Sequence, residues 1–218
     1  MIPGMLRRFV TLALLAVALL GAQAQAPFTQ AQLDELYVRI DDVLGLRPSA
    51  VVADIGTGFA VGHALHIAEK IAPGGKIVCV DVRQSVIDRI RTEAGARALT
   101  NVEAVLGGDD DPKLTAAAFD AILVSNTYHE FTQPQAMLKH LREALKPGGI
   151  LVVVENCSTA HRNDSRPDQT KRHDISPDLL ERELSVEGFV VRQRIDPIMV
   201  ETPDRFRYLF KAEIESRH

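Results

Sequence analysis

The chain has 218 residues, of which 46% are hydrophobic and 25% charged, and its formal net charge at pH 7 is −4. This length and composition suit one globular domain with a substantial core and argue against a disordered or fibrous protein. Acidic and basic residues are interleaved without a basic stripe, so we expect no nucleic-acid partner.

The N-terminus has the layout of a secretory signal. Arg7 and Arg8 precede the apolar residues 9–20, and an A-x-A pattern of small residues follows. The apolar run is shorter than the ~20 residues that a membrane span needs, which disfavours an uncleaved anchor. We predict a signal peptide over residues 1–24, cleaved after Ala24. The mature protein would be exported, periplasmic or secreted, without stable membrane insertion.

Hydrophobic periodicity divides the rest of the chain into a helical lead-in, residues 25–48, and one domain, residues 49–218. In the domain, short apolar runs alternate with helical patterns. The expected strands are Val51–Ile55, Lys76–Asp81, Val102–Leu106, Ala121–Ser125 and Ile150–Glu155. Near-continuous apolar strands of this kind indicate a parallel sheet buried on both faces. Phe189–Ile195 and Phe206–Glu213 follow without a helix between them, which predicts an antiparallel hairpin at the sheet edge.

Local patterns also predict where several helices begin. Ser85–Asp88 and Thr132–Gln135 fit the capping-box pattern. Ser176 is expected to cap a helix whose first residue is Pro177. The polar segment Ser158–Asp174 is expected to be a loop over the strand ends.

A glycine turn follows the first strand of the domain, where Asp54, Gly56 and Gly58 lie between a strand and a helix. Glycines at this point let the backbone approach a ligand closely, at the strand ends where open α/β sheets bind cofactors. Asp54 would repel a pyrophosphate and suits a cationic ligand. Asp81 ends the next strand and is placed to accept hydrogen bonds from two ribose hydroxyls.

These and three further features occur in the order typical of one family. They are the glycine turn (Asp54, Gly56, Gly58), the acid Asp81, the strand Phe119-Asp120-Ala-Ile-Leu-Val, the turn Leu145-Lys-Pro-Gly-Gly149 and the final hairpin. From about Ser49 onward, the chain resembles the class I S-adenosylmethionine-dependent methyltransferases. The resemblance implies S-adenosylmethionine as cofactor and a doubly wound, mostly parallel seven-stranded sheet of order 3-2-1-4-5-7-6. Ala60 departs from it, because the family often has a third glycine there.

The loop after the third strand carries a run of acids. Many relatives place an acid directly after the glycine that ends this strand, but here Gly108 follows Gly107. The adenine contact is therefore expected to shift to Asp109 or Asp110, and the sequence leaves the choice open. A solvated acidic turn is the alternative interpretation.

The fourth strand ends in a polar and aromatic cluster where methyl donor and acceptor would meet. Ser125 and Asn126 are expected to contact the cofactor, and Tyr128 and His129 are the catalytic candidates. His129 is the preferred general base because the unperturbed pKa of histidine is near neutrality. The alternative is that Tyr128 and His129 only shape the pocket wall. A similar strand ending, with the pattern D-x-Y-H-E-F, occurs in exported bacterial methyltransferase-like proteins. This chain departs from that pattern at its first position, which is Asn126.

The remaining histidines and the two cysteines suggest neither a metal site nor a disulfide. No nearby carboxylate or cysteine completes a metal set with His63 and His66, so we expect both to face solvent. The His129-Glu130 pair is not followed by the second histidine that a zinc-protease helix has. We expect His173 to be a surface residue, although it could reach over the site. In the implied order, two other strands separate the strands of Cys79 and Cys157. At about 4.8 Å per strand step, this exceeds the ~7 Å limit for a disulfide.

The sequence therefore predicts a methyltransferase for a small-molecule acceptor. A non-catalytic S-adenosylmethionine-binding protein is one alternative. A nicotinamide-dependent oxidoreductase is another, disfavoured by Asp54 and the terminal hairpin. The acceptor and the oligomeric state stay open.

Overall fold

The computed structural model describes residues 29–59 and 61–215. The predicted signal peptide, its cleavage site and Ala60 lie outside these residues, so the expectations about them stay predictions. Among the described residues, no helix is long and apolar enough to cross a membrane.

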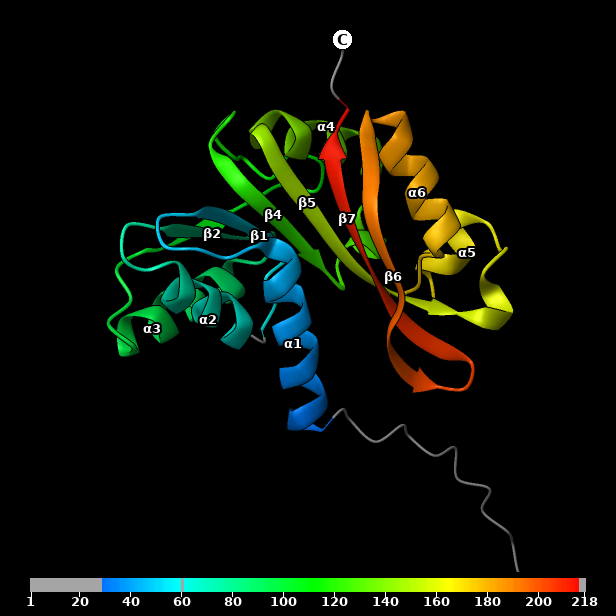
Figure 1. The fold of residues 1–218 in the computed structure, drawn as a ribbon, viewed down its shortest axis with the longest axis horizontal. Helices are drawn as coiled ribbons and strands as arrows, with labels where there is room; N and C mark the ends of the chain where they lie inside the picture. Colours follow the sequence, from blue (N-terminus) through cyan, green and yellow to red (C-terminus); the bar gives the residue numbers. More distant parts are fainter. Residues whose placement is uncertain (1–28, 60, 216–218) are drawn as a thin grey trace, which may run out of the picture.

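A seven-stranded sheet forms the centre of the domain, in the order β3-β2-β1-β4-β5-β7-β6 (Figure 1). The strands are β1 (Val51–Ile55), β2 (Lys76–Asp81), β3 (Val102–Leu106), β4 (Phe119–Ser125), β5 (Leu145–Ser158), β6 (Phe189–Thr202) and β7 (Arg205–Ile214). The first five pair in parallel, whereas β7 is antiparallel to both β5 and β6. The predicted strand order and the C-terminal hairpin are confirmed.

Helices cover both faces of the sheet. They are α1 (Gln30–Leu44), α2 (Gly62–Ile71), α3 (Gln84–Ala96), α4 (Pro134–Ala144), α5 (Arg166–Thr170) and α6 (Pro177–Val186), with short 3-10 helices η1 (Tyr128–Glu130) and η2 (Thr159–His161). Figure 1 shows α2 and α3 grouped beside β1 and β2, and α5 and α6 beside β6. Val52 packs in the core with α1, α2 and α3, while its neighbour Ala53 packs in the core with α4 and α6. This alternation explains why the strands are apolar on both faces.

Helix α1 has well-defined ends. The Thr29 side chain accepts a hydrogen bond from the Gln32 backbone, and the Gln32 side chain accepts one from the Thr29 backbone. This is a capping box. Gly45 ends the helix in the left-handed region with φ of 61°, a conformation that glycine adopts without a steric penalty.

The capping boxes predicted elsewhere are wrong. Helix α3 begins at Gln84, so Ser85 lies inside it, and α4 begins at Pro134, two residues after Thr132. Neither helix has a side-chain hydrogen bond at its cap. Ser176 does precede α6, as predicted, although its side chain makes no capping hydrogen bond.

The segment predicted as a loop, Ser158–Asp174, contains η2 and α5 and begins with the last residue of β5. Cys79 in β2 and Cys157 in β5 are both buried and free, with β1 and β4 between their strands. Burial raises the pKa of the Cys157 thiol to about 12. The expectation of two unbridged thiols is confirmed.

Candidate functional site

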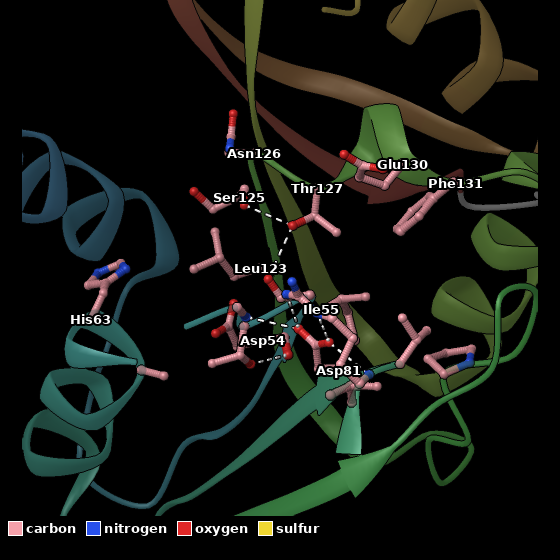
Figure 2. Close-up of a pocket in the computed structure, with 18 of the residues that line it drawn as sticks. Asp54, Ile55, His63, Asp81, Leu123, Ser125, Asn126, Thr127, Glu130 and Phe131 are labelled. Carbon is pink, nitrogen blue, oxygen red and sulfur yellow. Dashed lines mark hydrogen bonds and ion pairs between the residues drawn. The ribbon is translucent and has the colours of Figure 1, made fainter. Parts of the chain in front are cut away.

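A cavity of about 650 Å³ lies at the carboxyl ends of β1, β2 and β4. Its wall includes seven of the predicted cofactor contacts, namely Asp54, Gly56, Gly58, Asp81, Asp109, Ser125 and Asn126. Asp110 is not part of the wall, so Asp109 is the acid of the third loop that reaches the cavity. Figure 2 shows Asp54 and Asp81 close together, with Ser125, Asn126 and Thr127 across from them.

The glycine turn after β1 fits tightly against the end of β4. Gly56 and Gly58 have φ of 71° and 68°, a region that disfavours other side chains. A Cβ atom at Gly56 would overlap the Thr127 side chain. The Thr127 hydroxyl donates to the Gly56 carbonyl at 3.1 Å and lies 3.1 Å from the Ser125 carbonyl. Gly56 is therefore required by both its backbone conformation and this close approach.

Asp54 places a carboxyl group in the cavity with only 7% of the residue exposed. Burial raises the pKa of Asp54, with the nearby charge of His63 acting in the opposite direction and that of Asp81 adding to the rise. A buried carboxylate gains from a positively charged neighbour. The cavity is thus suited to a ligand with a cationic group near Asp54.

Asp81 is held by donors from two segments. Its Oδ2 accepts the Gly58 N–H at 3.0 Å, and its Oδ1 accepts the Arg83 N–H at 3.0 Å. Burial alone would raise the pKa of Asp81, but the hydrogen bonds from Arg83 and Gly58 hold it below its usual value. Asp81 is therefore an ionised hydrogen-bond acceptor at neutral pH.

Helix α1 forms a wall of the cavity that the sequence analysis did not anticipate. Tyr37 and His63 both line the cavity and stack on each other, with ring centroids 4.1 Å apart and an interplanar angle of 10°. Asp41 lies between two histidines, 2.9 Å from Nε2 of His63 and 3.1 Å from Nε2 of His66. The expectation that both histidines face solvent is wrong for His63, which is buried against α1.

The end of β4 turns sharply at Asn126. Its φ of 52° lies in the left-handed region, which asparagine tolerates better than most residues. The Asn126 N–H donates to the Val154 carbonyl at 2.7 Å, and its side-chain oxygen accepts from Asn156. These contacts direct the following residues along the rim of the cavity.

Neither Tyr128 nor His129 lines the cavity, which corrects the expectation that they meet the reacting groups there. Tyr128 is fully buried, and its hydroxyl donates to Glu183 of α6 at 2.7 Å. Burial and the Glu183 carboxylate raise the pKa of this hydroxyl. Tyr128 thus joins η1 to α6 and has a structural role.

His129 is also buried, with Nδ1 2.9 Å from Oε2 of Glu155 and Nε2 3.2 Å from Oε1 of Glu130. Burial alone would lower its pKa, but the hydrogen bond and charge of Glu155, together with Glu130, raise it. A raised pKa favours the protonated imidazole, which cannot accept a proton, so the shift disfavours His129 as a general base.

Beyond Asn126 and Thr127, the residues of this segment that line the cavity are Glu130 and Phe131 (Figure 2). Arg207 of β7 also lines it, with Nε 2.7 Å from Oε1 of Glu201. The sequence marked the segment after β4 as functional but could not show which of its side chains turn inward. Arg207 carries no motif that would have identified it.

Comparisons with known proteins agree with this geometry. Residues 53–151 match a family described as a methyltransferase domain. The chain is 30% identical over 112 residues to nocamycin O-methyltransferase from Saccharothrix syringae, covering 51% of this chain and 39% of that protein. It is 25% identical over 174 residues to the ubiquinone/menaquinone biosynthesis C-methyltransferase UbiE of Shewanella sp. (strain ANA-3), covering 78% and 62%. The chain thus spans less than two thirds of the length of these relatives.

Among solved structures, a SAM dependent methyltransferase from Aquifex aeolicus has the same fold, with a TM-score of 0.70 and 21% sequence identity. The alignment covers 85% of this chain and 94% of that one. The strand order, the glycine turn with its two acids and the family match agree. Residues 53–151 are thus similar to a methyltransferase domain, and the described chain has the fold of S-adenosylmethionine-dependent methyltransferases.

Proposed function

We propose that the cavity binds S-adenosylmethionine and that the chain transfers its methyl group to a small-molecule acceptor. The observation that carries the proposal is the pair of buried acids, Asp54 and Asp81, at the ends of adjacent strands beside the Gly56 turn. The cavity volume of about 650 Å³ is within the usual range for small-molecule sites.

Each acid has a separate task in this proposal. Asp81, ionised and held by Gly58 and Arg83, accepts hydrogen bonds from the ribose hydroxyls. Asp54 stabilises positive charge in the cavity, and Asp109 accepts from the adenine amino group. When bound, the cofactor supplies a methyl group on a sulfonium. The chain contributes mainly by holding the donor and acceptor close and aligned.

The acceptor is expected against the part of the cavity wall to which no cofactor group is assigned above, which includes Asn126, Glu130, Phe131 and Tyr37. This wall combines aromatic rings with a carboxylate and an amide, which suits a small molecule with both apolar and polar groups. The names of the two relatives refer to nocamycin and to quinones, which supports the same class of acceptor.

Binding is tested by calorimetry with S-adenosylhomocysteine, the product form of the cofactor. We expect Asp81→Asn to weaken binding about tenfold or more, because it removes a charged acceptor. Asp88→Asn is the matched control, since Asp88 is an exposed acid on α3, and it should bind as the wild type does. The proposal fails if the wild type binds neither S-adenosylmethionine nor S-adenosylhomocysteine. Binding of a reduced nicotinamide cofactor instead, followed by fluorescence, would favour the oxidoreductase alternative.

Export is a second part of the proposal, supported by the basic and apolar pattern of residues 1–24. N-terminal sequencing of the protein from a cell-envelope fraction should begin at Gln25. Recovery of the uncleaved chain from the cytosol would contradict export.

A further inference from the structure

Two histidines and a carboxylate meet at the rim of the cavity. Nε2 of His129 is 3.2 Å from Oε1 of Glu130, and Nδ1 of His173 is 3.0 Å from the same oxygen. Within residues 29–59 and 61–215, this is the group of three whose potential ligand atoms all lie within 4.8 Å of one another. We propose that His129, Glu130 and His173 bind a divalent transition-metal ion.

The donor set and its spacing fit such an ion. Two imidazoles and one carboxylate are the protein ligands of many catalytic zinc sites, which leave a further position open. For bonds of about 2.0–2.1 Å in a tetrahedron, neighbouring donor atoms lie roughly 3.3 Å apart. The distances of 3.2 Å and 3.0 Å are close to this value. The same two distances also fit a carboxylate that accepts hydrogen bonds from both imidazoles. Titration with a metal ion, described below, distinguishes a metal site from this hydrogen-bonded cluster.

The surroundings of His129 are a second, independent indication. Its Nδ1 lies 2.9 Å from Oε2 of Glu155, a carboxylate that is completely buried. Metal-binding histidines usually donate their other ring N–H to a carboxylate or carbonyl, which fixes the tautomer and directs the free nitrogen to the metal. Glu155 also accepts the backbone N–H groups of His129 and Asn156, at 3.2 Å and 3.1 Å. The His129 ring is therefore oriented before any ion arrives.

His173 reaches the cluster from the turn after α5, 43 residues beyond Glu130. Its backbone φ is 56°, and its carbonyl accepts from Nη2 of Arg205 on β7 at 3.3 Å. The next residue, Asp174, forms an ion pair with the same arginine at 2.9 Å. The His173 ring meets His129 edge-on, with centroids 5.1 Å apart. Because His173 lies 43 residues beyond Glu130 in the chain, the sequence shows no second histidine near His129. For this reason the sequence predicted no metal site.

The position of the cluster suggests a use for the ion. Glu130 lines the cavity and belongs to the part of its wall assigned above to the acceptor. With Glu130 as a ligand, such an ion would lie beside the cavity, where it could bind an oxygen of the acceptor as a Lewis acid. This use rests on the proposed methyl transfer, but the binding of the ion does not.

The proposal is tested with tag-free protein that has been treated with a chelator and is then titrated with Zn²⁺ in a calorimeter. We expect one ion per chain in the wild type and binding weakened about tenfold or more in His173→Ala and in Glu130→Gln. The His173 side chain is 67% exposed, so its removal should leave the fold intact, which circular dichroism checks.

His66→Ala is the matched control, because His66 is a half-exposed histidine paired with a carboxylate in the other histidine cluster, on α2. It should bind Zn²⁺ as the wild type does. The proposal is overturned if the wild type does not bind Zn²⁺, if His173→Ala binds it equally well, or if His66→Ala abolishes binding. Titration of the same samples with S-adenosylhomocysteine shows separately whether the cofactor site is intact.

Discussion

The guanidinium of Arg83 lies against both carboxylate oxygens of Asp81, with Nε 3.0 Å from Oδ1 and Nη2 3.2 Å from Oδ2. The Arg83 side chain is about half exposed and also lies over the Phe59 ring, 4.9 Å from its centroid. These carboxylate oxygens are the ones that we assign to the ribose hydroxyls. The arginine and the ribose therefore compete for the same acceptors.

Replacing Arg83 with methionine should strengthen binding of S-adenosylhomocysteine. Asp81 is buried but Arg83 is half exposed; with the value of about 0.2–1 kcal/mol typical of surface ion pairs, removal of the arginine should raise the affinity by up to about fivefold. Calorimetry measures the change. Arg91→Met, which removes an exposed arginine paired with Asp88 on α3, should have no effect. Weaker binding in Arg83→Met would show that the arginine supports the ligand.

Gly56→Ala should destabilise the domain and reduce cofactor binding. The φ of 71° costs a residue with a side chain roughly 1–3 kcal/mol, and the new methyl group would overlap Thr127. Urea unfolding gives the change in stability. Gly62→Ala at the first residue of α2 is the control, because a methyl group added there would meet no neighbouring atom within 4 Å, so stability should change little. Equal stabilities for the two variants would contradict this account of the turn.

Tyr128→Phe should lower stability without changing cofactor affinity. It removes the donor to buried Glu183, which costs about 1–3 kcal/mol when the acceptor stays unsatisfied. The free energy of unfolding and the affinity for S-adenosylhomocysteine are measured on the same preparation. Unchanged stability with slower methyl transfer would instead restore Tyr128 as a catalytic residue.

Asp120 should make the stability of the domain sensitive to acid. It accepts the Val51 N–H at 2.8 Å and pairs with Lys146 at 2.9 Å. Partial burial alone would raise its pKa, but these donors and Arg47 hold it below its usual value. Its stabilising contribution is therefore complete above a pH of about 3.9 and is lost as the pH falls through the lower pKa of the folded state.

Urea unfolding of wild type and Asp120→Asn across this pH range tests the effect. The wild type should be more stable at neutral pH, and the difference should shrink as the pH falls below about 3.9. A difference that does not depend on pH would mean that the contribution of Asp120 is not ionic.

The sheet and the acids of the cofactor site could be predicted because their signals are local in the sequence. Strands buried on both faces are continuous apolar runs, and the runs that form β1 and β2 are visible without any partner. In a parallel sheet the carboxyl ends of neighbouring strands share one edge, so Asp54 and Asp81 had to lie near each other. The same reasoning placed the end of β4 beside them.

Contacts between distant segments could not be predicted in this way. Asp41 meets His63 across two helices, and Tyr128 meets Glu183 across 55 residues. Such pairs depend on helix rotation and side-chain rotamers, which periodicity does not specify. The capping-box predictions were wrong for a related reason. The residues at Ser85 match the capping-box pattern, but the helix already begins one residue earlier, at Gln84.

The wall formed by α1 lies outside the part of the chain that matches the family, residues 53–151, whereas the acids assigned to the cofactor lie inside it. Tyr37 therefore faces the cavity from a segment that makes none of the proposed cofactor contacts. If the acceptor binds against this wall, as proposed above, substitutions in α1 would change which acceptors fit while the strands beneath keep their shape. Acceptor selectivity would then diverge faster than cofactor binding, in evolution or by design.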